Sequence, residues 1–232
     1  MQLVQGLRPL RLDEFNVMRR PGLVALYVLS LLVGAYAVVG YGLGPGSTQL
    51  HPEMRATFVS HPVGISTHIF ASALALLLGP FQFSMRLRSR WPTLHRWTGR
   101  VYLGVAVLVG GIAGLYMSYF AFGGVAAKLG FACLACAWLF TGTRAYVAAR
   151  QRDFVSHRRW MIRNYGLTFA AVTLRLYLPP VFLLQLPFEL AYPVIAWICW
   201  VPNLLLAQWF ANRPHSPSLQ PTRRGLGPSP GG

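Results

Sequence analysis

Apolar residues fall in six long blocks, separated by short segments rich in arginine, glycine and proline. The blocks cover residues 22–43, 61–83, 97–120, 125–149, 160–178 and 188–210. Each has close to the ~20 mostly apolar residues that a helix needs to cross a bilayer. The pattern therefore predicts an all-α integral membrane protein with six transmembrane helices.

Glycine, proline and arginine mark the connections between the blocks. Gly123-Gly124 predicts a tight turn, and Pro179-Pro180 predicts the break that ends the fifth block. Two arginine-rich segments, 86–100 and 150–163, are predicted as basic loops.

The blocks leave little chain for a soluble domain. We expect residues 1–20 to be a cytoplasmic N-terminal segment and residues 21–211 to be one membrane domain. The second to fifth helices are expected to form a central four-helix bundle, flanked by the first and sixth. Residues 212–232, rich in proline, glycine and serine, are predicted to be a disordered cytoplasmic tail.

The charged residues are few, and their placement indicates an orientation. Only 11% of the residues are charged, whereas soluble domains have about 25%. All but three of the 21 basic residues lie on the side that carries both termini; the exceptions are Arg55, Lys128 and Arg175. Because basic residues are retained in cytoplasmic segments, both termini are predicted to be cytoplasmic. We expect a multi-pass protein of a prokaryotic inner (plasma) membrane.

The net charge of +16 alone would also suit a nucleic-acid-binding protein. That function needs a basic face on a soluble fold. Here the arginines flank apolar blocks, so the expected partner is the lipid bilayer and no nucleic acid.

Polar residues inside the blocks keep one helical face. Such residues are costly in lipid and usually face the interior of a bundle. In the fifth block, successive spacings of four, three, four and seven place one stripe on a single face: His157, Met161, Asn164, Thr168 and Arg175. In the second block, His61, His68 and Ser72 share a face.

His95 and His157 both lie at predicted cytoplasmic helix ends, surrounded by arginines. Two facing histidines can supply the axial ligands of haem b, and arginines suit its propionates. The predicted cofactor site comprises His95, His157, His68, Arg100, Arg163, Arg175 and Asn164, with the three histidines as metal ligands. The alternative is that His95 and His157 contact lipid headgroups.

His68 and Arg175 are the ionisable residues expected deepest in the outer half. His68 could ligate a second haem, hydrogen-bond a quinone or carry protons. Arg175 could pair with Glu53 or Glu189, bind a propionate, hold an anionic substrate or extend toward the outer interface. None of the five acidic residues lies deep in a block, which argues against a carboxylate-driven transporter.

Three stretches carry a resemblance to a known family. They are His68 with Gly79-Pro80-Phe81-Gln82-Phe83, then Leu94-His95-Arg96-Trp97-Thr98-Gly99-Arg100-Val101-Tyr102, then His157-Arg158-Arg159-Trp160-Met161-Ile162-Arg163-Asn164-Tyr165 with Arg175 downstream. Over residues 64–180 the chain resembles a bacterial membrane-protein family known as domain of unknown function 2306. That name implies no activity.

A more distant similarity is to cytochrome b561-type proteins, which have six spans and haem-binding histidines on the central four. His95 and His157 match that family's third-and-fifth pair by span number. The fourth span here has no histidine, so the family's other pair is broken.

The leading hypothesis is a haem-b-binding membrane protein that passes electrons within or across the membrane; an oxidoreductase activity with a quinone or redox partner would fit this hypothesis. The alternative is a cofactor-free small-molecule transporter or lipid-binding membrane protein, with His68 and Arg175 forming the polar site. A partner or assembly subunit without chemistry of its own is the third interpretation.

Overall fold

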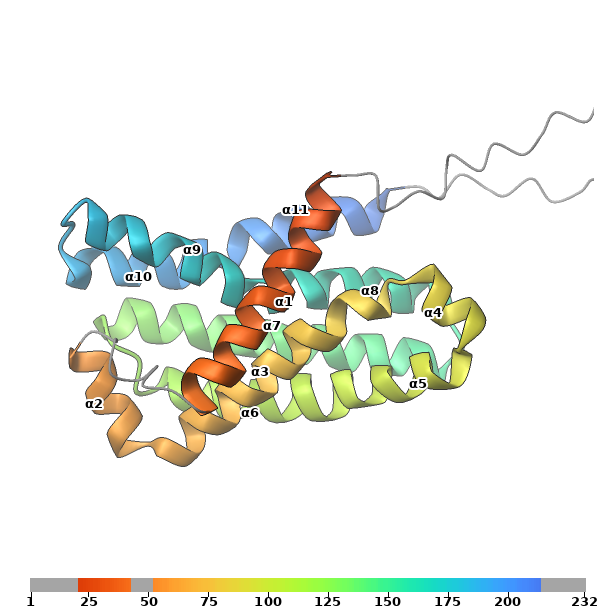
Figure 1. Ribbon diagram of the computed structural model, residues 1–232, viewed down its shortest axis with the longest axis horizontal. Helices are drawn as coiled ribbons and strands as arrows, with labels where there is room; N and C mark the ends of the chain where they lie inside the picture. The colour runs from red at the N-terminus through yellow and green to blue at the C-terminus, as the bar shows by residue number, and fades with distance from the viewer. Residues whose placement is uncertain (1–20, 43–51, 214–232) are drawn as a thin grey trace, which may run out of the picture.

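The computed structural model describes residues 21–42 and 52–213, and within these ranges the chain forms helices joined by short connections, without strands (Figure 1). The predicted N-terminal segment 1–20 and residues 214–232 of the predicted tail 212–232 lie outside the described residues, and Asn212 is the last residue of α11. The elements are α1 (Pro21–Gly42), α2 (Pro52–Ser60), α3 (Pro62–Gln82), α4 (Met85–Arg90), α5 (Pro92–Arg100), a π-helical segment (Val101–Val107), α6 (Leu108–Ser118), α7 (Gly124–Arg150), α8 (Phe154–Thr168), α9 (Ala170–Leu183), α10 (Phe188–Ile198) and α11 (Val201–Asn212).

Six segments are long and apolar enough to cross a membrane, which confirms the prediction of six spans. They are α1, α3, α5 through α6, α7, α8 with α9, and α10 with α11. Many side chains on their outer surfaces are apolar and exposed; Leu32, Val63 and Leu205 are 61%, 78% and 65% exposed. A contiguous apolar exterior of this kind suits contact with lipid.

Figure 1 shows that the spans alternate in direction. At one end lie α4, the start of α5, the end of α7 and the start of α8; we call it the basic end because it carries the arginine-rich segments 86–100 and 150–163. At the opposite end lie α2, the end of α9 and the start of α10. The predicted turn before α7 is confirmed: Gly123 and Gly124 have φ of +92° and +69°, a backbone conformation that favours glycine.

Both predicted basic loops are wrong in most of their length: segment 86–100 forms α4 and α5, and of segment 150–163 only residues 151–153 are non-helical. The Ser84 hydroxyl accepts the Leu87 N–H at 3.2 Å and thereby caps α4. Pro92 then occupies the first turn of α5, where its missing N–H costs nothing. The loop at 86–100 was predicted from the basic composition of the segment, which does not take account of Ser84 and Pro92 as residues that start helices.

The predicted break at Pro179-Pro180 is also wrong, because both prolines lie inside α9. The proline ring fixes φ near the helical value, and the helix ends at Leu183, so only bonds near its end are lost. The interruption of this span lies at Phe169, between α8 and α9. A second interruption, at Cys199 and Trp200, divides the last span just before Pro202, whose ring disfavours a continuous helix.

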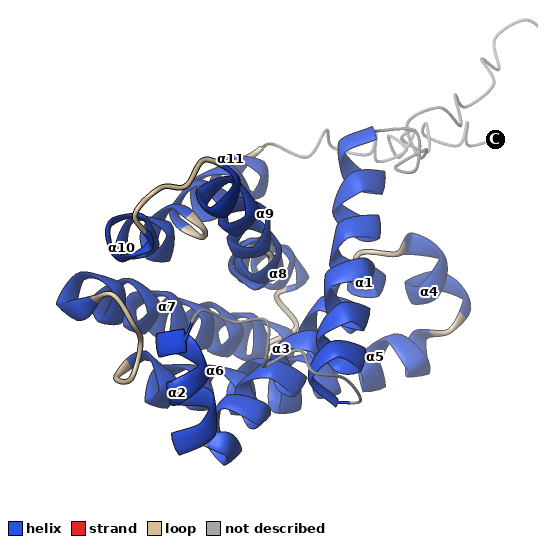
Figure 2. Cartoon of the chain, turned by 60° about the vertical axis from the view of Figure 1, so that its left-hand side comes forward, coloured by secondary structure: helices blue, strands red, loops and turns tan. Residues whose placement is uncertain are grey.

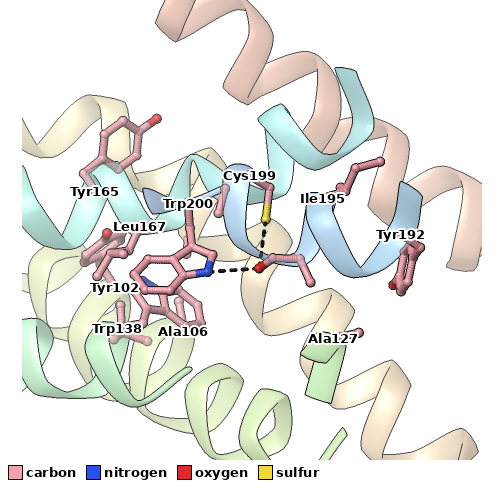
Figure 3. Packing of buried hydrophobic residues seen from close by; sticks show 14 of the residues in the cluster. Tyr102, Ala106, Ala127, Trp138, Tyr165, Leu167, Tyr192, Ile195, Cys199 and Trp200 are labelled. Carbon is pink, nitrogen blue, oxygen red and sulfur yellow. Dashed lines mark hydrogen bonds between the residues drawn. The ribbon is translucent and has the colours of Figure 1, made fainter. Parts of the chain in front are cut away.

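The last span packs with α10 on α7 and with α11 on α8, whereas α1 lies against α3 at the side of the molecule (Figure 2). Two tyrosines attach α1 to the rest. The Tyr27 hydroxyl donates to the Pro80 carbonyl at 2.6 Å, and the Tyr165 hydroxyl donates to Ser30 at 2.7 Å. Figure 3 shows the buried aromatic core between these helices, which includes Tyr102, Trp138 and Trp200.

Candidate functional site

A cavity of about 280 Å³ lies among the spans, on the side of the interruptions that faces α2 and α10. Its wall is mainly apolar and includes Ile69, Met117 and Leu174. Its polar lining comes from helices far apart in the sequence and includes Tyr41, Thr57, His68, Ser72, Ser118, Trp138, Thr168, Arg175 and Tyr192. The structure therefore brings two of the predicted site residues, His68 and Arg175, to one cavity.

His68 is held in a fixed orientation by α6. Its Nδ1 lies 2.9 Å from the Gly110 carbonyl oxygen. Because a carbonyl can only accept, Nδ1 carries the proton and Nε2 remains an acceptor. Gly114, one turn further along α6, leaves room for the ring: a Cβ there would lie 2.8 Å from His68 Nδ1.

Arg175 on α9 lines the same cavity as His68, and its side-chain hydrogen bonds go to a backbone carbonyl and to Tyr41. Its Nη1 donates to the Ala171 carbonyl at 2.9 Å, and it interacts electrostatically with Tyr41 of α1 and with His68. No carboxylate is among these interactions of the described residues. Glu189 is exposed at the start of α10, and the side chain of Glu53 lies outside the described residues.

Both interrupted spans border this cavity. Thr168, Ala170 and Cys199, which flank the interruptions, are part of its lining. The hydroxyl of Thr173 donates to the Cys199 carbonyl, and Asn203 Nδ2 donates to the same oxygen at 2.9 Å. Side chains thus replace the helical bonds that the interruption removes, as a backbone away from water requires.

Asn164, predicted as a cofactor ligand, lies in a fully buried hydrogen-bond network beside the cavity. Its Oδ1 accepts from the Tyr102 hydroxyl at 2.8 Å, and its Nδ2 donates to the Trp138 carbonyl at 2.9 Å and to Thr141 Oγ1 at 3.0 Å. Thr168 completes the network by accepting the Trp138 indole N–H at 2.9 Å. The amide of Asn164 is therefore used to join α7, α8 and the π-helical segment.

The other predicted residues lie at the basic end. His157 Nδ1 is 2.8 Å from the Ala145 carbonyl oxygen, and His95 interacts electrostatically with His157. Arg163 donates to Gln208 at 2.5 Å and to Asn212 at 3.2 Å, which ties α8 to α11. The Arg100 guanidinium lies 5.1 Å from the ring of Trp97.

The three histidines predicted as metal ligands thus fall into two places, His68 in the cavity and His95 with His157 at the basic end. No group of three or more histidine, cysteine or acidic side chains that could hold a metal occurs in the described part of the chain.

Sequence reasoning missed Tyr41 and Trp138 as cavity residues. Each has a polar hydrogen that needs a partner inside a bundle, and this was the signal available. Their partners could not be assigned because the rotation of each helix about its axis was unknown.

The motifs that carry the family resemblance are largely positions of contact between helices. Gln82 Nε2 donates to Thr98 Oγ1 at 2.9 Å, so the end of α3 is tied to α5. Gly79 lies where a Cβ would come within 2.2 Å of the Tyr165 ring. These residues position the spans around the cavity.

Searches of curated proteins and of solved structures give no match to this chain, and the distant similarity to cytochrome b561-type proteins has no support from them. The model of one family, described as predicted membrane protein (DUF2306), matches residues 65–211, well over half of the chain. The match extends beyond the 64–180 expected from the motifs and includes the last span. On this evidence the chain belongs to the DUF2306 family of membrane proteins.

Proposed function

We propose that the protein binds a small, mostly apolar molecule with an acidic group in the cavity between His68 and Arg175, and acts as a cofactor-free transporter or lipid-binding protein. The observation that carries this proposal is the Arg175 guanidinium in an apolar wall, without a carboxylate among its interactions in the described residues. A cation removed from water is costly unless it is paired. A carboxylate or phosphate on the ligand supplies the pair, and the planar guanidinium can bind it through two hydrogen bonds.

The rest of the cavity narrows the class of ligand. The apolar wall favours an alkyl or ring system, and His68 Nε2 can accept a hydrogen bond from a ligand hydroxyl. The volume of about 280 Å³ is below the ~300–1,000 Å³ of pockets that hold drug-sized molecules. A short amphiphile therefore fits better than a full-length lipid.

The interrupted spans support the transporter form of the proposal. In many transporters, substrate sites are formed near mid-membrane by discontinuous helices. Here the ends of α8 and α10 both reach the cavity.

The test compares octanoate with 1-octanol, which share an alkyl chain and differ in charge. The measurement is the thermal unfolding of the purified protein in a neutral detergent. At ten times its dissociation constant, octanoate should stabilise the protein by about 1.4 kcal/mol, a rise in unfolding temperature of roughly 3–6 °C. Octanol should give much less.

Arg175→Gln should abolish the octanoate effect, because it removes the charge and keeps a polar side chain. Arg100→Gln is the matched control, since it removes an arginine at the basic end. The proposal is rejected if octanol stabilises the protein as well as octanoate does, or if Arg175→Gln keeps the full effect.

We retain haem b between His95 and His157, with electron transfer through the membrane, as a second candidate. One observation favours it: His157 donates from Nδ1 to a backbone carbonyl, which leaves Nε2 available in the way usual for metal-binding histidines. Oxidised and reduced absorption spectra after haem-replete expression provide the test. A Soret band that disappears in His95→Ala and His157→Ala, and persists in His61→Ala, is expected; a colourless protein rejects this candidate.

A further inference from the structure

Four basic side chains from three helices converge at the basic end of the molecule. We call them the basic cluster: Arg88 of α4, His95 of α5, and His157 and Arg158 of α8. His95 interacts electrostatically with Arg88 and with His157, and Arg158 interacts with Arg88. The guanidinium groups of Arg88 and Arg158 repel each other, and an anion bound between them would relieve that repulsion.

The described residues offer this cluster no carboxylate. Asp153 precedes α8 at the same end, but its Oδ1 accepts the Ser156 N–H at 3.0 Å and caps that helix. Asp153 is exposed, and its interaction with an arginine is with Arg159. An anionic group from another molecule can therefore supply the negative charge that the described residues do not.

One donor or acceptor in the cluster has no partner of its own. His95 Nδ1 is buried, and it forms no hydrogen bond within the described residues. His157, by contrast, is anchored through Nδ1 to the Ala145 carbonyl at 2.8 Å, so its ring orientation is fixed. A buried polar nitrogen normally has a partner, and its absence here indicates a missing ligand.

The surroundings of the cluster fit the membrane interface. Trp91 and Trp97 are 60% and 59% exposed beside α4 and α5. Exposed tryptophans are enriched where a membrane meets water, at the level of the lipid headgroups. Arg86 on the short helix α4 adds positive charge at the same level.

We propose that the basic cluster is a binding site for the phosphate group of an anionic membrane lipid. Phosphate presents several oxygens to arginine forks, and basic pockets between transmembrane helices are suited to lipid headgroups. This site is separate from the cavity of Arg175 and does not depend on the function proposed for it.

Binding of dioctanoyl phosphatidic acid to the purified protein in neutral detergent tests the proposal. Dioctanoyl phosphatidylcholine and inorganic phosphate serve as the comparison ligands. We expect phosphatidic acid to bind and the zwitterionic lipid to bind at least tenfold more weakly. Arg88→Gln combined with Arg158→Gln removes two charge-assisted donors to the phosphate and should weaken phosphatidic acid binding by roughly tenfold or more.

Arg90→Gln combined with Arg150→Gln is the matched control, because it removes two arginines from the same end and outside the cluster. Equal weakening in both double variants would show a general charge effect and overturn the site. Binding of inorganic phosphate with the same affinity would assign the cluster to free phosphate and overturn the assignment to a lipid.

Arg88→Lys, a mild change at an exposed residue, should retain part of the affinity if the cluster is the site. A Soret band that is lost in His95→Ala would assign the cluster to haem propionates and would also overturn the proposal.

Discussion

Removing the Tyr102 hydroxyl tests whether the buried network holds the third, fourth and fifth spans together. The side chain is completely buried, and its hydroxyl is 2.8 Å from Asn164 Oδ1 and 3.0 Å from Thr168 Oγ1. Tyr102→Phe keeps the ring and deletes both contacts. Thr168 keeps the Trp138 indole as a donor, whereas Asn164 Oδ1 has no other donor in the described residues.

The expected loss of unfolding free energy in Tyr102→Phe follows from the fact that Thr168 keeps a donor and Asn164 Oδ1 does not. A buried polar atom left without a partner costs about 1–3 kcal/mol in soluble proteins, whereas interhelical hydrogen bonds in membranes average only about 0.6 kcal/mol. One lost bond together with one unpaired oxygen should therefore lower the free energy of unfolding by about 1–2 kcal/mol. Asn164→Ala should cost more, about 2–4 kcal/mol, because it removes three hydrogen bonds and leaves a small cavity.

Equilibrium unfolding in mixed micelles with increasing SDS measures these free energies. Tyr146→Phe is the control, because this hydroxyl is at the exposed surface, where it accepts from Arg150 at 3.4 Å. Its effect should stay below about 0.5 kcal/mol. A Tyr102→Phe effect no larger than that of the control would refute the structural role given to the network.

Three further outcomes are expected. Gly114→Ala places a Cβ 2.8 Å from His68 Nδ1 and should displace the ring, so octanoate should stabilise this variant less than it stabilises the unmodified protein in thermal unfolding. Thr173→Val removes the donor to the Cys199 carbonyl and should lower the unfolding free energy by about 1 kcal/mol in the SDS assay, whereas Thr173→Ser should not. The hydrogen bonds from Ser156 hold the pKa of Asp153 below its usual value, so its carboxylate stabilises α8 at neutral pH and this contribution is lost as the pH falls through that lowered pKa. The difference in unfolding temperature between the unmodified protein and Asp153→Ala should accordingly be present at pH 7 and shrink in strong acid; a difference that does not change with pH would contradict the cap.

The spans were predictable because a bilayer imposes their length and apolar character on the sequence. The interruption near Pro202 had a local signal, since proline lacks an N–H. The interruption at Phe169 had none, because it follows from the packing of α8 and α9 against other helices. The opposite error occurred at Pro179-Pro180: the two prolines predicted a break, but α9 continues through both.

The candidate site was predictable residue by residue, and its assembly was not. His68 and Arg175 stood out as ionisable side chains in apolar blocks, but periodicity gives the face of a helix and not the neighbour that it meets. Asn164 shared the polar stripe of Arg175, yet it contacts Tyr102 and Trp138, because the stripe is divided by the interruption at Phe169. The haem assignment for His95, His157 and His68 stays a prediction, as do the cytoplasmic side of both termini and the central four-helix bundle.

The two interruptions make α9 and α10 a helical hairpin, which one or two non-helical residues join to α8 on one side and to α11 on the other. The hydrogen-bond network of Asn164 lies outside this hairpin, in α7, α8 and the π-helical segment. The hydrogen bond from Thr173 to the Cys199 carbonyl links α9 to the end of α10. A tilt of the hairpin would change the separation of Arg175 from His68 and leave the bonds of Asn164 intact. Such a tilt would also shift the ring contacts of Phe188 and Tyr192 with Phe122, so the shape of the cavity and the packing of α10 on α7 are linked.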